Sequence, residues 1–399
     1  MKKLYFTLLS IILLAGADAL AKPYVVMASL DGFRWDYLGR GITPNLDSLA
    51  GAGSKALTLE PCFPSVTFPN HISIITGMYP QNHGIIDNYI VNKNNGSVYK
   101  LNDAAQVTNP DWYLGEAFWE TARRNGIITA SYFWPGSELT QESRRPNYYE
   151  KYEHTRSHPA RVDGVLNWLR LPEDRRPQFI TLYFDLVDTK GHEYGPDSPE
   201  TNAAIARVDS AVGALARGIS KLPFADEVSL IVLSDHGMAR ISKDSTIDVA
   251  PMLAGLGCRS AGYGPFLGID CPDADEAFRR LKKGENRYKA YKTSEMPERF
   301  HYGANPFTPP ILILADLNWM LVNGAKLRDD YRGTHGFDNK TLDMHGIFIA
   351  SGSAFKASYQ VGSLRNIDVY PLLCEIFGIV PRSNIDGKSE RIDFILKGK

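Results

Sequence analysis

The chain has 399 residues, enough for two domains of average size or for one large α/β enzyme domain. Apolar residues make up 44% of it and charged residues 22%, which excludes a disordered, collagen-like or coiled-coil protein. The 44 Lys and Arg nearly balance the 45 Asp and Glu, so the sequence has no basic footprint for a nucleic-acid polymer, and four cysteines are too few for a disulfide scaffold.

Residues 1–21 have the pattern of a secretory signal peptide. Lys2 and Lys3 form a basic start, residues 4–17 are mostly apolar, and residues 19–21 match the small-x-small cleavage pattern. The apolar run is shorter than the roughly 20 residues of a membrane-spanning helix, and no later stretch reaches that length. We therefore expect a mature chain from Lys22 that is exported to the periplasm and has no stable membrane anchor.

Short apolar runs alternate with helical patterns along residues 22–399, which is typical of a mostly parallel sheet flanked by helices in one α/β domain. Thr43 and Pro44 mark the start of a helix that continues to Ala50. The expected strands are 24–30, 127–133, 179–184, 228–233 and 346–350, and the other expected helices are 163–169, 202–219 and 366–377.

The segment from about 243 to 330 breaks this alternation because it is rich in Gly, Pro and Tyr. We expect it to be an insertion that forms a lid or a wall of the site, not an independent domain. Export permits disulfides, and Cys258 and Cys271 are close enough in sequence to staple a loop of this segment. The partners of Cys62 and Cys374, like the oligomeric state, stay open at this stage.

Asp and His residues gather where the expected strands end. Asp31 follows strand 24–30, the pair Asp235 and His236 follows strand 228–233, and strand 179–184 leads into Asp185, Asp188 and His192. A fourth cluster, with His335, precedes strand 346–350. Ligands of open α/β sheets bind beyond the carboxyl ends of the strands, so we expect these groups at one edge of the sheet.

This set of carboxylates and imidazoles favours zinc, with manganese or iron as alternatives. Two such ions about 4 Å apart can clamp the attacking and leaving oxygens of a phosphoryl displacement. Thr67 is the candidate nucleophile, because it lies in a Pro-flanked turn before an expected helix, where backbone amides favour an alkoxide or a phosphate and a metal ion can activate the hydroxyl. Local sequence alone favours a simpler role for Thr67 as a helix cap.

Eight motifs in this order resemble the nucleotide pyrophosphatase/phosphodiesterase family of the alkaline phosphatase superfamily, and they span nearly the whole mature chain. The motifs are LDGFRWDYL, TPNLDSLAGAG, PCFPSVTFPNHISIITGMYPQNHGIIDN, FWPGSE, YFDLVDTKGHEYGP, LSDHGM, GTHGFDN and NIDVYPLLCEIFG. The resemblance implies an alkaline phosphatase-like fold and two zinc ions per chain.

The resemblance also implies a role for each matching residue. Thr67 corresponds to the nucleophile, which also contacts one zinc ion, and Asn88 to the residue that helps hold a phosphate oxygen. The ligands of the two ions correspond to Asp31, Asp235 and His236 for the first and to Asp188, His192 and His335 for the second. Phe68 and Tyr183 would lie beside the esterifying or leaving group, and Tyr152 would stack on a base, with Tyr148 and Tyr149 as competitors for that role.

Several other residues of similar type are expected to have no such role. His345 opens strand 346–350, but the family ligand is the His of HGFDN, which is His335. His71 and His83 are expected to be structural. Lys190, inside the DTKGH motif, is expected to be a solvated loop charge or a contact to a phosphate.

Three other readings of the motifs fit less well. Sulfatases use a C-x-P-x-R motif, but residues 62–66 (CFPSV) have Val66 where Arg is required, and counting back nine residues from Thr76, as in sulfatases, reaches Thr67 instead of Cys62. Phosphomonoesterases of the superfamily carry a Ser nucleophile and a phosphate-gripping Arg, and no such Arg is seen near Thr67. An inactive metal-binding relative would be expected to lack one of the seven ligand and nucleophile positions, and all are present.

The resemblance therefore implies a small-molecule hydrolase that cleaves phosphodiester or phosphoanhydride bonds of nucleotides through a covalent intermediate on Thr67. Aromatic side chains suit a stacked base. They also suit a choline cation or a lipid, so a choline- or lysophospholipid-type phosphodiesterase is the alternative.

Overall fold

The computed structural model describes residues 23–303 and 305–399, so the expected signal peptide at 1–21 lies outside the described residues. An eight-stranded sheet forms the centre of the molecule, in the order β19-β2-β18-β9-β1-β8-β6-β7. The strands, in that order, are Tyr359–Val361, Ser54–Ala56, Phe348–Gly352, Val228–Leu233, Tyr24–Leu30, Phe179–Phe184, Thr129–Tyr132 and Tyr148–Glu150. Within the described ranges no helix is both long and apolar enough to cross a bilayer.

The central strands explain why the apolar runs are continuous. Every residue of β9, β1 and β8 is buried, because helices cover both faces of the sheet. Strand β1 runs parallel to β8 and to β9, and β6 runs parallel to β8 and to β7. Strand β18 is antiparallel to β9, so the sheet is mostly parallel, as expected, with one reversed strand near its edge.

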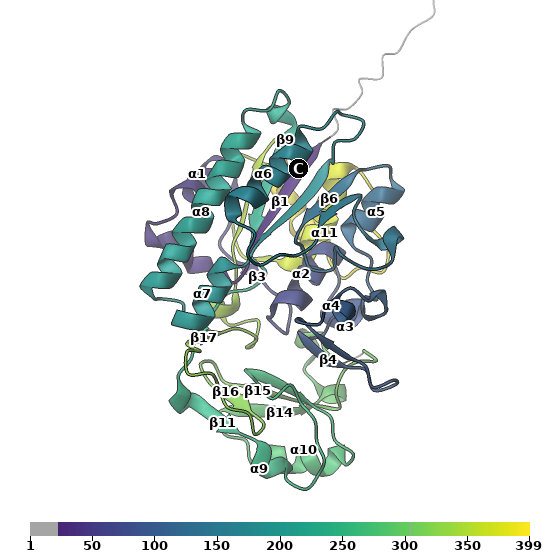
Figure 1. The fold of residues 1–399 in the computed structure, drawn as a ribbon, viewed down its shortest axis with the longest axis vertical. Helices are drawn as coiled ribbons and strands as arrows, with labels where there is room; N and C mark the ends of the chain where they lie inside the picture. Colours follow the sequence, from purple (N-terminus) through teal and green to yellow (C-terminus); the bar gives the residue numbers. More distant parts are fainter. Residues whose placement is uncertain (1–22, 304) are drawn as a thin grey trace, which may run out of the picture.

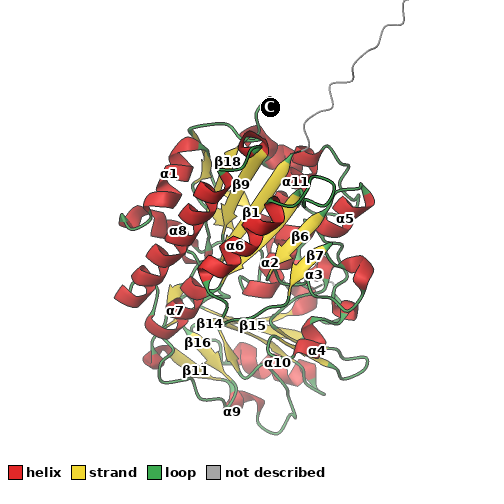
Figure 2. Ribbon diagram, turned by 45° about the horizontal axis from the view of Figure 1, so that its top comes forward, coloured by secondary structure: helices red, strands yellow, loops and turns green. Residues whose placement is uncertain are grey.

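Two helical layers cover the sheet (Figures 1 and 2). Alternate residues of β1 face opposite layers, with Val26 and Ala28 in one apolar cluster and Val25 and Met27 in the other. The first cluster includes α1 (Pro44–Ala52), α6 (His158–Leu169) and α8 (Pro199–Ile219), and the second includes α2 (Thr67–Thr76), α5 (Phe118–Arg124) and α11 (Val369–Phe377).

The short elements α3 (Pro80–His83), α4 (Ala104–Val107) and the hairpin of β4 (Tyr89–Val91) and β5 (Val98–Lys100) lie beside α2. Helices α6 and α8 begin earlier than expected. Ser157 and Ser198 cap their first turns by accepting backbone N–H groups, and each helix has a proline in its first turn.

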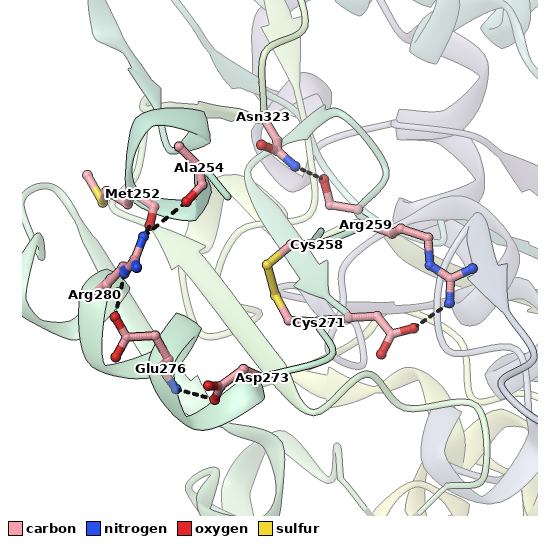
Figure 3. The surroundings of a disulfide bond; sticks show 11 residues. Met252, Ala254, Cys258, Arg259, Cys271, Asp273, Glu276, Arg280 and Asn323 are labelled. Atoms are coloured by element: carbon pink, nitrogen blue, oxygen red, sulfur yellow. Dashed lines mark hydrogen bonds and ion pairs between the residues drawn. A yellow bond between two sulfur atoms is a disulfide. The ribbon is translucent and has the colours of Figure 1, made fainter. Parts of the chain in front are cut away.

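Residues 246–303 and 305–322 form a separate layer beyond the carboxyl ends of the central strands (Figure 1). Two three-stranded sheets, β11-β16-β12 and β13-β15-β14, pack with helices α9 (Ala250–Leu253) and α10 (Ala274–Lys283) around their own apolar core. The strands in chain order are Thr246–Asp248, Tyr263–Gly264, Phe266–Ile269, Tyr288–Lys292, Ile311–Ala315 and Met320–Val322. A disulfide joins Cys258 to Cys271 (Figure 3), whereas Cys62 and Cys374 are buried free thiols.

Candidate active site

The acidic and imidazole side chains expected at one edge of the sheet do meet there. Asp31 follows β1, Asp235 and His236 follow β9, and helix α7 (Leu186–Tyr194), which follows β8, carries Asp188 and His192. His335 comes directly after the short strand β17 (Gly333–Thr334), which pairs with β10 (Ala239–Arg240). Because β18 is antiparallel to β9, the segment that precedes it reaches the edge at which β1, β8 and β9 end.

The first ligand set surrounds His236. Its Nε2 lies 3.4 Å from Asp31 Oδ1 and 3.0 Å from Asp235 Oδ2. The Thr67 hydroxyl lies 3.2 Å from the same nitrogen. All four side chains are buried. The three candidate ligands of this set, two carboxylates and one imidazole, can converge on one metal ion.

The second ligand set lies directly beside the first. His192 Nε2 and His335 Nε2 each lie 3.4 Å from an oxygen of Asp188 and 3.1 Å from one another. The rings of His236 and His335 stack with their centroids 3.7 Å apart. Asp188, His236 and His335 also form a group able to hold an ion, so His236 lies between the two sets.

Hydrogen bonds fix the tautomers of the three imidazoles. His192, His236 and His335 each donate from Nδ1 to a backbone carbonyl, those of Gly333, Gly237 and Ser65 respectively, at 2.8, 2.9 and 3.0 Å. A carbonyl only accepts, so each Nε2 presents a lone pair toward the cluster. This is the form in which histidine binds a metal ion.

The carboxylates of the cluster also have oxygens that no hydrogen-bond donor of the described residues satisfies. Asp31 Oδ1, Asp188 Oδ1 and Asp235 Oδ2 are buried without a hydrogen-bond partner. Buried acceptors without a partner are costly and rare. Together with the lone pairs of the histidines, they form a set of acceptors only, which is the donor chemistry of a mixed carboxylate–imidazole metal site.

Crowding of charge at the cluster shifts the pKa values of its groups. Burial, together with the neighbouring Asp235 and Asp188, raises the pKa of Asp31 well above its usual range. Burial would also raise the pKa of Asp188, but His192 and His335 lower it to about 2. Burial and the adjacent His236 lower the pKa of His335 to about 3, which keeps this imidazole neutral near pH 7.

Thr67 is the first residue of α2, and the N-cap position belongs to Val66. The helix-cap alternative for Thr67 is therefore wrong. Asn88 accepts the N–H of Phe68 at 3.1 Å, which holds its amide beside the turn that carries Thr67. His71 stabilises the same turn, because its Nδ1 donates to the Thr67 carbonyl at 2.9 Å.

A hollow of about 310 Å³ opens beside Thr67, and we call it the Tyr152 hollow. Phe68, Tyr152 and Tyr183 line it together with Asp31 and Asp188. Tyr183 donates its hydroxyl to Asp31 Oδ2. Neither Tyr148 nor Tyr149 lines this hollow: Tyr148 packs against the sheet core, and the Tyr149 hydroxyl accepts from Arg145.

The same hollow contains residues that sequence reasoning did not assign. Glu138 and His154 line it, and so does Asp185, which binds Arg161 and His154 at 2.8 Å each. Glu138 ends the FWPGSE motif, so the motif held a signal for it. His154 is part of no motif.

The remaining candidates have structural partners. His83 bonds Ser73 and the Pro69 carbonyl, and His345 bonds Thr58 and the Asn339 carbonyl. Lys190 pairs with Glu193. His71 differs from the others because it also lies 3.3 Å from Asp235 Oδ2, next to the cluster.

At Gly32, the residue after Asp31, the end of β1 lies directly against Asp188 of α7. The φ of Gly32 is +66°, a conformation that favours glycine, and a Cβ there would stand 2.9 Å from Asp188 Cα. A side chain at this position would push α7 away from the end of β1.

A doubly covered α/β sheet with this cluster and a threonine at one edge defines a protein of the alkaline phosphatase-like class. Comparison of the sequence is more specific: residues 25–338 match the model of the family described as type I phosphodiesterase/nucleotide pyrophosphatase. The chain belongs to this family.

Relatives of known name agree with the assignment. A venom phosphodiesterase from Crotalus durissus collilineatus is 35% identical over 94% of this chain and 46% of its own length. Human ectonucleotide pyrophosphatase/phosphodiesterase family member 1 is 34% identical over 94% of this chain and 42% of its own length. This chain thus spans less than half the length of these two relatives.

Solved structures match over the whole of their own chains. Human ectonucleotide pyrophosphatase/phosphodiesterase 5 has a TM-score of 0.89 and 29% identity, and it covers 94% of this chain. A structure of the murine protein matches with a TM-score of 0.88 and the same identity and coverage. It shows an inactive threonine-to-alanine variant in complex with AMP.

Proposed function

We propose that this protein hydrolyses phosphodiester or phosphoanhydride bonds of nucleotides, with two zinc ions and a covalent intermediate on Thr67. The observation that carries the proposal is the position of the Thr67 hydroxyl, 3.2 Å from His236 Nε2 at the junction of two ligand sets. Asp31, Asp235 and His236 would hold one ion, and Asp188, His192 and His335 the other. Zinc bound there supplies Lewis acidity and lowers the pKa of a bound hydroxyl or water.

The residues of the chain then perform two displacements. The Thr67 oxygen, after loss of its proton, bonds to phosphorus as the P–O bond to the leaving group breaks. Asn88 holds a phosphate oxygen, and His71 holds the Thr67 carbonyl, which keeps the turn in place. Water then attacks phosphorus from the side that the leaving group vacated, and the bond to Thr67 breaks. Two inversions leave net retention at phosphorus.

The retained nucleotide would occupy the Tyr152 hollow. Phe68 and Tyr152 offer ring faces on which a base stacks, and a solved relative binds AMP. Glu138 also places a carboxylate among these rings, which favours the alternative of a choline diester, because a cation binds between aromatic faces. Comparing kcat/KM for ATP, a nitrophenyl nucleotide ester and glycerophosphocholine separates the two.

We propose export to the periplasm on the pattern of residues 1–21. The Cys258–Cys271 disulfide supports it, since disulfides persist in oxidising compartments. We also propose that the 243–330 insertion forms a wall of the site, since Tyr263 and Phe266 face the ligand histidines across a second hollow.

The test is the variant Thr67→Ala in the full mature chain. Turnover of ATP and of the nitrophenyl ester should be abolished while metal content, measured by plasma mass spectrometry, stays near two ions per chain. Chelation should inactivate the unchanged enzyme, and zinc should restore it. Near-normal activity of Thr67→Ala would refute the nucleophile assignment.

A further inference from the structure

The two candidate ligand sets are held by different kinds of structure. The residues of the first set directly follow the fully buried strands β1 and β9. In the second set, His335 follows β17, a strand of only two residues that pairs with β10. So short a pairing fixes little by itself. The position of His335 therefore depends on contacts with another part of the chain.

Those contacts come from Ser65, a fully buried residue of the turn before α2. Its carbonyl accepts the Nδ1–H of His335 at 3.0 Å, and its hydroxyl donates to the Phe337 carbonyl at 2.8 Å. We call residues 333–337 the His335 segment. The two bonds hold this segment at His335 and again two residues later, so they fix both its distance from the turn and its orientation.

Gly336, between the two residues that Ser65 holds, shows how closely the segment packs on the turn. Its φ is +107°, a conformation that favours glycine, and a Cβ there would stand 3.1 Å from Val66 Cγ1. Val66 lies between Ser65 and Thr67 in the chain. The His335 segment therefore packs directly against the turn that carries the proposed nucleophile.

The other two histidines of the cluster are oriented by different carbonyls. His236 donates to Gly237, its own neighbour in the chain, and His192 donates to Gly333. Because Gly333 belongs to the His335 segment, the orientation of the His192 ring depends on that segment as well. Both histidines of the second set thus depend on the segment that Ser65 holds.

We propose that Ser65 is a positioning residue that couples the second ligand set to Thr67. The inference rests on the proposed function, in which an ion held by the second set lies beside the nucleophile. A carbonyl that accepts from Nδ1 orients the Nε2 lone pair of the same ring. The Ser65 hydroxyl keeps this carbonyl in place against the His335 segment.

Such a coupling acts in both directions, because a linkage between two binding or ordering events is reciprocal. An ion in the second set orders the turn before α2, and a loosened turn weakens the binding of that ion. The first set, which follows buried strands, should be insensitive to the same change.

The test measures the zinc affinity of the metal-free mature chain by competition with a chelator, without turnover. The step lost in His335→Ala identifies the second set. Ser65→Ala keeps the carbonyl but removes the hydroxyl, and it should weaken this step about tenfold or more while the other step stays unchanged. In the double variant of Ser65→Ala with His335→Ala, the remaining step should equal that of His335→Ala alone, because the two residues act through one another.

Ser73→Ala is the matched control. Ser73 is equally buried and lies on α2, but its hydroxyl bonds His83 instead of a ligand-bearing segment. This variant also loses a buried hydroxyl, so its thermal unfolding temperature should fall as that of Ser65→Ala does, whereas both zinc steps should stay unchanged. Ser65→Thr retains the hydroxyl and should retain the affinity of the second set.

Hydrogen exchange in the unsubstituted chain gives a second measurement that does not require Ser65→Ala to fold. Filling the second set with zinc should slow the exchange of amides in residues 62–67. The same zinc concentration should slow it less in His335→Ala, which lacks a ligand of that set.

Three results would overturn the coupling: an unchanged second step in Ser65→Ala, an equal loss in Ser73→Ala, or exchange in residues 62–67 that does not respond to the second ion. If the chain bound no zinc, the proposed function and the coupling would both fail. If Thr67→Ala kept its activity, the nucleophile assignment would fail, while the zinc steps would still decide on the coupling.

Discussion

The central sheet and the insertion contribute to the same site in different ways. Five of the six candidate metal ligands come just after the long, fully buried strands β1, β8 and β9, so their positions are fixed by the main core, whereas His335 follows the short strand β17. The proposed wall, which carries Tyr263 and Phe266, comes from short, mostly antiparallel strands with a small core of their own and a disulfide. The difference teaches that the candidate metal ligands and the proposed wall of the site are built on parts of the molecule with separate apolar cores, so that substitutions in one part should leave the other measurable.

The largest effect is expected at the edge of the main sheet. His335→Ala removes a proposed metal ligand of the second set, so kcat/KM should fall at least about 1000-fold, the loss of several kcal/mol of charge stabilisation. Metal content should drop from two ions toward one. Lys190→Ala, which loses a surface ion pair with Glu193, is the control. Full metal content and activity in His335→Ala would place the ion elsewhere.

In the insertion, the corresponding change is the double variant Cys258→Ser with Cys271→Ser. Loss of a cross-link over this short loop should lower the free energy of unfolding of the insertion by about 3 kcal/mol. Hydrogen exchange should show faster opening of residues 246–322 and little change in β1, β8 and β9. If the variant also lost its metal ions, the two parts would not be separable.

A variant of His71 tests whether the residues around Thr67, the proposed nucleophile, affect turnover as well as folding. His71 Nδ1 holds the Thr67 carbonyl and lies 3.3 Å from Asp235 Oδ2, so His71 is a positioning residue. His71→Ala should lower kcat about 10- to 100-fold with little change in KM. Steady-state kinetics on ATP measures the split. A proportional loss of folded protein, seen by circular dichroism, would indicate a structural role alone.

The smallest expected effect is a pH dependence of the free energy of unfolding that arises from His83. Burial lowers the pKa of His83 to about 3, from an ordinary value near 6.5. Between these values the unfolded chain binds a proton that the folded chain does not, so stability falls as pH drops below about 6.5, by up to about 1.4 kcal/mol per pH unit. Urea unfolding at pH 6.5 and 5.5 measures it. A His83→Asn variant should lose less stability between these two pH values. An equal loss would show that His83 does not cause the pH dependence.

The sequence predicts the main sheet well because burial leaves a simple pattern. Strands 24–30, 179–184 and 228–233 are observed with these bounds, since each is apolar throughout and covered on both faces. The helix starts at His158 and Pro199 were missed, although Ser157 and Ser198 carry a capping signal. The meeting of the ligand residues was expected from the strand ends.

Other features depend on contacts between distant segments. Nothing local reveals that β18 is reversed or that β13 and β14 both pair with β15. The sequence does not show which of Tyr148, Tyr149 and Tyr152 lines the hollow. Only the fold shows that Tyr148 and Tyr149 lie on β7, whereas Tyr152 lies in the loop after it and lines the hollow. Tyr263 and Tyr331 belong to no motif, and only folding brings them beside His192.

The late position of strand β18 and of the His335 segment in the chain determines when the site can be completed during biosynthesis. The partner strand β2 comes from early in the chain, while β18 itself and the His335 segment come late, so the ligand sets stay incomplete until nearly the whole polypeptide has emerged. A chain translocated unfolded, as the proposed export implies, would then acquire its ions only after crossing. If the chain is exported and binds zinc as proposed, the zinc supply outside the cytoplasm would govern how much of the protein becomes active.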